Sequence, residues 1–200
     1  MEPAFDLRRS GSVAGALTSV AALAGAFALF GAPAVGATDP WAKLRRPLDI
    51  PHIAPDSPCP VSARTRPSRN HPFALGPGPA YPLGLLRATT LSFLYPVQPS
   101  QIWYPSDWSG NKVLWTVAPR YRGPVLIRGR QLDGPNLVRF DDGSVPPAEL
   151  RLPSGGVTSA NGFRDRPSFT RLRAPGCYAW QVDGTTFSQV IVFRAAISRH

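Results

Sequence analysis

From residue 59 onward, apolar residues occur in short runs that Gly, Pro, Asn and Asp interrupt. This spacing is typical of a protein built from many short β-strands. Residues 112–118, for example, place Val113, Trp115 and Val117 on one face of a strand. Further strands are predicted at residues 89–95, 125–129, 137–140, 148–152, 169–173, 176–183 and 187–194.

The last two predicted strands flank residues 183–186 (Asp-Gly-Thr-Thr), a sequence typical of a tight hairpin. Residues 190–193 (Val-Ile-Val-Phe) are apolar on both faces, as expected for a strand inside a sandwich. Apart from residues 1–37, no segment sustains a helical period without a proline. We therefore predict an all-β domain at residues 59–197, an immunoglobulin-like β-sandwich of about seven to nine strands.

Residues 1–37 have the features of an export signal. Residues 8–9 are both arginine, and residues 13–30 form a weakly hydrophobic run rich in Ala, Leu and Gly. Residues 35–37 (Val-Gly-Ala) fit a signal-peptidase site, so we predict a mature chain that begins near Thr38 and is secreted or held at the cell envelope. The alternative is an uncleaved membrane anchor, because about 18 apolar residues approach the minimum length for a span.

Residues 38–58 are predicted to form a linker between the signal peptide and the domain. Prolines at this density prevent helix formation and favour an extended, polyproline-like chain. We interpret the segment as a stalk, with a proline-rich ligand for another protein as the alternative. The prolines are Pro40, Pro47, Pro51, Pro55 and Pro58.

The two cysteines, Cys59 and Cys177, are expected to form a disulfide. An export signal directs them to an oxidising compartment, where an even count in a small domain indicates pairing. Two cysteines are too few for a structural zinc site, which needs four ligands. Because Cys59 stands at the start of the predicted domain, we expect the bond to fix the first strand.

Several short motifs resemble those of a loose group of uncharacterised exported bacterial proteins, many of them lipoproteins. The resemblance covers roughly residues 59–194 and implies the fold and the location, but it implies no activity. The chain departs from the group at Gln131, where Arg is usual, and at Tyr178, where Trp is common. The motifs are Cys-Pro-Val-Ser at 59–62, Lys-Val-Leu-Trp at 112–115, Val-Leu-Ile-Arg-Gly-Arg-Gln-Leu-Asp at 125–133 and Gly-Cys-Tyr at 176–178.

The chain is strongly basic, with a formal net charge of +10. Such a charge favours anionic envelope polymers, acidic lipids or nucleic acid as partners. However, 20 of the 22 basic residues are arginine, and this bias is typical of GC-rich coding sequences whatever the partner. The arginines are scattered along the sequence without the dense runs of nucleic-acid-binding arms, so we expect no specific nucleic-acid binding.

The residues needed for nucleophilic hydrolysis do not form a known pattern. His52 and His71 lie among prolines, His200 is the last residue, and a Gly-x-Ser-x-Gly motif is absent. Residues 133–142 could offer oxygens to calcium, but they lack the regular alternation of a calcium loop. The acidic residues of the predicted domain are Asp107, Asp133, Asp141, Asp142, Glu149, Asp165 and Asp183. Three of them directly precede Gly, where Asp stabilises turns.

Three large aromatic residues, Trp103, Tyr104 and Trp108, fall in a loop between two predicted strands. With Asp107 and Asn111 nearby, their rings could stack on sugars, because loops at the end of a sandwich commonly carry binding sites. This hypothesis requires at least two exposed and roughly coplanar rings. The alternative is that the tryptophans fold back and cap the core.

Together these features predict a non-catalytic binding or structural protein of the cell envelope or the extracellular space. The expected partner class is an envelope glycan or an anionic polymer, and we expect neither a cofactor nor a metal. Contact with a membrane is expected only through an uncleaved leader. The rival hypothesis is a secreted enzyme with a carboxylate or metal site, which would require acidic side chains that converge in a cleft.

Overall fold

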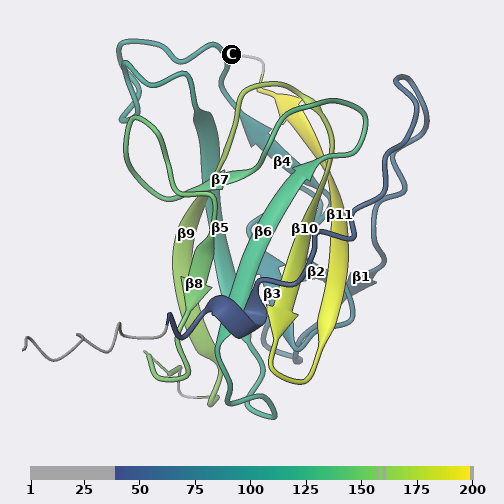
Figure 1. The fold of residues 1–200 in the computed structure, drawn as a ribbon, viewed down its shortest axis with the longest axis vertical. Helices are drawn as coiled ribbons and strands as arrows, with labels where there is room; N and C mark the ends of the chain where they lie inside the picture. Colours follow the sequence, from purple (N-terminus) through teal and green to yellow (C-terminus); the bar gives the residue numbers. More distant parts are fainter. Residues whose placement is uncertain (1–38, 157, 160, 199–200) are drawn as a thin grey trace, which may run out of the picture. The chain divides into compact units, whose positions relative to one another are not determined.

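A computed structural model describes residues 39–156, 158–159 and 161–198. Two β-sheets face each other across a hydrophobic core, which confirms the β-sandwich (Figure 1). The immunoglobulin-like type stays a prediction. The expected signal peptide and its cleavage site lie outside the described residues, and none of the described helices is long and apolar enough to span a membrane.

The four-stranded sheet has the order β3-β5-β9-β7 and the five-stranded sheet the order β4-β11-β10-β6-β8. Neighbouring strands are antiparallel except β4 and β11, which are parallel. The first sheet contains β3 (Ala80–Leu83), β5 (Ser109–Val117), β9 (Arg164–Leu172) and β7 (Arg139–Phe140). The second contains β4 (Thr90–Phe93), β11 (Ser188–Ile197), β10 (Gly176–Gly184), β6 (Val125–Gln131) and β8 (Leu150–Leu152). A separate hairpin consists of β1 (Arg64–Thr65) and β2 (Ala74–Leu75).

The sequence prediction missed β3 and the first half of β9, because each contains a proline. Pro82 lies inside β3, and Pro167 lies inside β9, whose first half was not predicted. Proline cannot donate a hydrogen bond to a neighbouring strand, so it is tolerated mainly where one side of a strand is unpaired. Both cases fit this rule, because β3 is an edge strand and β9 pairs with β7 only at Thr170 and Arg171.

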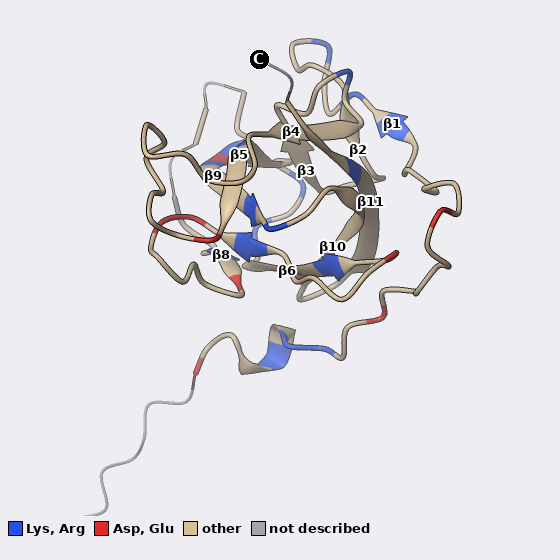
Figure 2. Cartoon of the chain, turned by 90° about the horizontal axis from the view of Figure 1, so that it is seen from above, with Lys and Arg blue, Asp and Glu red and all other residues tan. Residues whose placement is uncertain are grey.

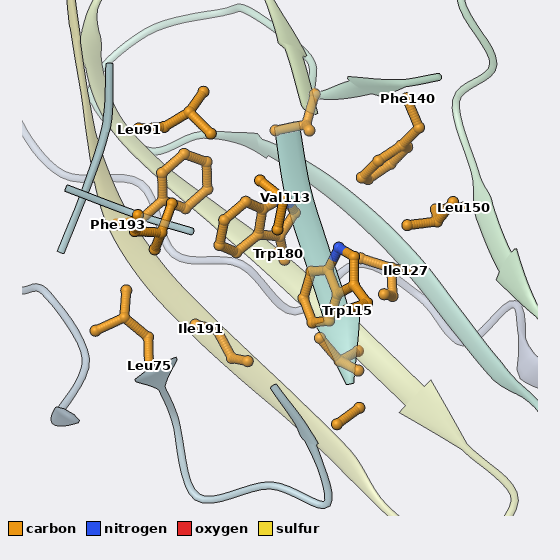
Figure 3. Close-up of a cluster of buried hydrophobic side chains, with 14 of the residues drawn as sticks. Leu75, Leu91, Val113, Trp115, Ile127, Phe140, Leu150, Trp180, Ile191 and Phe193 are labelled. Atoms are coloured by element: carbon orange, nitrogen blue, oxygen red, sulfur yellow. The ribbon is translucent and has the colours of Figure 1, made fainter. Parts of the chain in front are cut away.

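The centre of the core is an aromatic stack that joins the two sheets (Figure 3). Trp115 of β5 meets Trp180 of β10 edge to face, with ring centroids 5.3 Å apart. The ring of Phe193 in β11 stacks nearly parallel on the indole of Trp180, with ring centroids 3.7 Å apart. Neither tryptophan N–H has a hydrogen-bond acceptor among the residues that the structure describes, so packing rather than polar contact holds the stack in place.

The segment predicted as a stalk is instead part of the fold. Residues 39–62, here called the strap, begin with a short 3-10 helix, η1 (Ala42–Leu44), and run in extended form past β6 and β10 (Figure 2). Leu44 and Ile50 are buried, and the amide of Ile53 donates to the carbonyl of Leu132 at 3.0 Å. The prolines do keep the chain extended, but these apolar residues attach it to the sheet.

The strap explains why β10 is buried on both faces. On the face turned away from the core, Ala179 and Val192 form a second apolar cluster with Ile50 and Cys177. Beside this cluster, the buried carboxylate of Asp183 is bonded to arginines of the strap and of β6. The core, both sheets and the disulfide all lie after residue 37, so we expect residues 38–200 to fold without the leader.

Candidate functional site

The disulfide between Cys59 and Cys177 is confirmed, with Cα atoms 5.4 Å apart across a sequence separation of 118. It fixes the strap rather than a first strand, because Cys59 lies in an irregular part of the chain outside the sheets. Structural disulfides of this kind are typical of proteins in oxidising compartments outside the cytoplasm.

Three of the four motifs that carry the resemblance, those at 59–62, 125–133 and 176–178, meet beside this disulfide. The amide of Leu132 donates to the carbonyl of Cys177 at 2.8 Å, and the amide of Cys177 donates to a carboxylate oxygen of Asp133 at 2.9 Å. Gly176 has a φ of 147°, which side chains rarely adopt, and a Cβ atom there would lie 2.4 Å from the side-chain Nε2 of Gln131, so glycine is favoured at this position. These residues hold the end of β10 in place, which assigns them a structural role.

The aromatic loop does not present its three rings on one exposed face. Tyr104 is 55% exposed, Trp103 is half-buried and Trp108 is only 7% exposed. The Trp103 ring packs edge to face on Phe169, with centroids 5.6 Å apart. The ring of Trp108 contacts two guanidinium groups. Only one of the three rings is exposed, so they do not meet the requirement of at least two exposed rings for a flat sugar-binding platform.

A buried arginine explains this arrangement. Arg171 of β9 pairs with Gly110 of β5. Val113 and Trp115 of β5 point into the core, and because side chains alternate along a strand, Gly110 and its partner Arg171 face away from it. Its Nε donates to the carbonyl of Trp108 at 3.1 Å, and its Nη1 donates to the carbonyl of Asp141 at 2.9 Å. Loss of hydration lowers the pKa of Arg171 to about 10, so the group stays cationic at neutral pH. The aromatic loop thus covers the outer face of the four-stranded sheet, not the core between the sheets.

The acidic side chains lie in separate places rather than in one cleft. Asp183 lies under the strap, Asp133 beside the disulfide, and Asp165 accepts a hydrogen bond from Thr116. Asp141 and Asp142 share a hollow of about 300 Å³ near the open edge of β9. Among the described residues, no three His, Cys, Asp or Glu side chains come together as metal ligands.

Two carboxylates in this region are already bound to arginines. Asp141 accepts from Arg166 at 2.6 Å, and Glu149 accepts from Arg45 and Arg151. The hydrogen bond from Arg45 is the main cause that holds the pKa of Glu149 below its ordinary value. A general acid at neutral pH needs the opposite shift. Glu149, whose pKa is held below its ordinary value, therefore does not fit the role of a general acid.

Three exposed arginines lie on the β1–β2 hairpin, here called the basic hairpin (residues 64–75). Arg64, Arg66 and Arg69 are exposed, and none of them forms an ion pair within the described residues. The guanidinium carbons of Arg64 and Arg66 lie 5.5 and 4.6 Å from the ring centroid of Phe73. Phe73 itself is 45% exposed, so arginines and an aromatic ring share one accessible surface.

The basic hairpin is firmly attached at its base and near its tip. Ala74 and Leu75 of β2 are fully buried. Near the tip, the imidazole of His71 packs on Phe163 with centroids 4.3 Å apart, and its Nδ1 lies 2.7 Å from the hydroxyl of Ser68. The cationic groups are therefore displayed on an ordered element.

Sequence reasoning missed the basic hairpin because it looked for dense basic runs. The available signal was the spacing Arg-x-Arg-x-x-Arg at 64–69, within a stretch from residue 57 to residue 106 that contains no Asp or Glu. Strand alternation then places Arg64 and Arg66 on the same side of the chain.

No protein-family model, curated protein or solved structure matches the chain. The resemblance to exported bacterial proteins stays a prediction, and the candidate site rests on its own geometry.

Proposed function

We propose that this protein is a non-catalytic binding protein of the cell envelope or extracellular space, and that its basic hairpin binds an anionic polymer. The observation that carries this proposal is the group of three exposed arginines on the basic hairpin, two of them beside Phe73, that have no carboxylate partner among the described residues. The disulfide supports a location outside the cytoplasm.

Several other arginines of the chain are used internally. All six ion pairs of the described residues involve Arg45, Arg46, Arg128, Arg151 or Arg166. The guanidinium groups of Arg130, Arg164 and Arg171 donate to backbone carbonyls. A GC-rich coding bias explains the abundance of arginine, but it does not explain why three unpaired arginines gather on one element.

The contact with Phe73 suits these arginines for binding anions. A guanidinium beside an aromatic ring is attracted to the ring face, which restricts its motion while its N–H donors stay accessible to a ligand. Phosphate and carboxylate groups accept two parallel hydrogen bonds from such a planar donor. Arg64 and Arg66 lie on the same side of the chain and Arg69 lies in the loop of the hairpin. The three guanidinium groups can therefore contact successive anionic groups of an extended polymer.

The test is a titration of residues 38–200 with long-chain polyphosphate, and with neutral dextran as the comparison polymer. Arg64→Gln/Arg66→Gln/Arg69→Gln is expected to bind polyphosphate at least about tenfold more weakly. Its slope of log K against log salt should be smaller by about two to three, because each lost phosphate contact removes close to one unit.

The matched control is Lys43→Gln/Arg87→Gln/Arg122→Gln, which removes the same charge from exposed positions elsewhere. This variant is expected to bind within about threefold of the unmodified protein. Equal losses in the two variants would assign binding to net charge and would contradict the basic hairpin as the site. Equal affinity for dextran would contradict an anionic ligand.

A further inference from the structure

Two loops carry exposed apolar side chains at the same end of the sandwich. Ile102 and Tyr104 belong to the loop between β4 and β5, and Val145 belongs to the loop between β7 and β8. The exposed fractions are 75% for Ile102, 55% for Tyr104 and 75% for Val145. The hydroxyl of Ser106 donates to the carbonyl of Ser144 at 2.7 Å, so the two loops are in direct contact. They are the teal and green loops at the upper left of Figure 1.

The exposure of these side chains does not result from loose loops. Arg171, fully buried beneath both loops, donates to the carbonyl of Trp108 in one loop and to that of Asp141 in the other. The same β4–β5 loop buries Trp108 between the guanidinium groups of Arg139 and Arg173. The chain thus uses an unusual buried cation to fix the loops, while their apolar tips remain in water.

We propose that these two loops form a docking surface for an anionic lipid bilayer. Protruding aliphatic tips can enter the boundary between head groups and acyl chains, and a tyrosine is well suited to that boundary. Lys112 and Arg173 are exposed near these loops, and the net charge of the chain is +10. Asp107 and Asp142 lie in or beside the loops, so the attraction to acidic lipids comes mainly from the protein as a whole.

This surface goes beyond the proposed function and does not depend on it. The docking loops and the basic hairpin lie on different elements and use different chemistry, since the first buries apolar tips and the second pairs guanidinium groups with anions. A bilayer and a polyanion could therefore be bound together, which would hold the polymer close to the membrane surface.

The test measures binding of residues 38–200 to vesicles of equal parts phosphatidylglycerol and phosphatidylcholine, by co-sedimentation. Ile102→Ser/Val145→Ser is expected to reduce partitioning at least about tenfold, because burial of each apolar side chain in the bilayer contributes to the free energy of binding independently of charge. The control Leu48→Ser/Leu86→Ser changes two other exposed apolar residues and should partition like the unmodified protein.

Hydrogen exchange on the vesicles locates the contact directly. Amides of residues 98–108 and 141–147 are expected to gain protection when vesicles bind. Unchanged partitioning of the loop variant would overturn the proposal, as would protection confined to the basic hairpin. A protein dimer that dissociates in the loop variant, with vesicle binding unchanged, would assign the surface to a second copy of this chain and would also overturn it.

Discussion

Replacement of Asp183 by alanine tests how the strap is held on the five-stranded sheet. The side chain of Asp183 has no exposed surface, and its carboxylate accepts from Arg128 at 3.0 Å and from Arg46 at 3.3 Å. Gln181 and Ser188 donate to it as well, at 3.0 and 2.6 Å. One carboxylate thus joins the strap, β6, β10 and β11.

The magnitude follows from the burial of the partners. Arg128 is 15% exposed, so removal of the carboxylate leaves a largely buried cation without its counter-ion. Loss of one partner of a buried ion pair costs about 3–5 kcal/mol. Arg46 is 37% exposed and contributes little to this figure, because water solvates it when the pair is broken. For a domain of this size the loss corresponds to a decrease in melting temperature of about 6–20 °C.

The assay is urea unfolding of residues 38–200 combined with hydrogen exchange. Strap amides that bond to the sheet, those of Asp49, Ile53 and Ser62, should lose protection in Asp183→Ala before the core does. Asp165→Ala, which removes a carboxylate from the exterior of the other sheet, is the control and should cost about 1 kcal/mol or less. A cost below about 1 kcal/mol for Asp183→Ala, or full protection of the strap in that variant, would refute the reasoning.

Three further predictions concern stability. Cys59→Ala/Cys177→Ala should lower the free energy of unfolding by about 4–5 kcal/mol, the chain-entropy value for a loop of over a hundred residues, and an unchanged urea midpoint would contradict this. Trp108→Ala should cost about 3–5 kcal/mol in a thermal melt, because the ring is buried under the aromatic loop; a nearly unchanged melting temperature would show that the ring stabilises little. Glu149→Gln should be less stable than the unmodified protein at pH 7. The carboxylate has a lowered pKa in the fold, so its contribution is present above its ordinary pKa of 4.5 and disappears as the pH falls below that value, and a difference that stays constant down to pH 3 would argue against the ion pairs.

The strand pattern was readable because each predicted strand had a local signal. Alternation at β5 and β6, and turn residues around Asp183 and Gly184, place the strands close to their observed bounds. The strap carried no such signal. Its prolines indicate an extended chain, but whether Ile50 rests on a sheet or faces water depends on Ala179 and Val192, which lie over a hundred residues away.

The burial of the tryptophans in the aromatic loop was not readable from the sequence for a similar reason. Trp103 and Trp108 stand in a sequence typical of an exposed loop, and composition alone indicates a stacking surface. Their burial depends on Arg171, 63 positions beyond Trp108 and on the outer face of another strand. The buried Arg171 holds the loop so that the tryptophans are not an exposed stacking surface. No local sequence pattern predicts which arginine of a basic chain will be buried.

The arginines also show that the fold, not the composition, decides which of them stabilise the protein and which are exposed. The chain carries guanidinium groups at many positions, and the fold gives two sets of them different surroundings. Arg128 and Arg171 are enclosed by acceptors, so their replacement should alter stability. Arg64 and Arg66 have an aromatic neighbour but no carboxylate or carbonyl partner among the described residues, so their replacement should leave the melting temperature unchanged while it weakens polyphosphate binding. A variant of the basic hairpin that lost stability as well would show that its arginines serve the fold, and the case for a binding surface at Phe73 would fail.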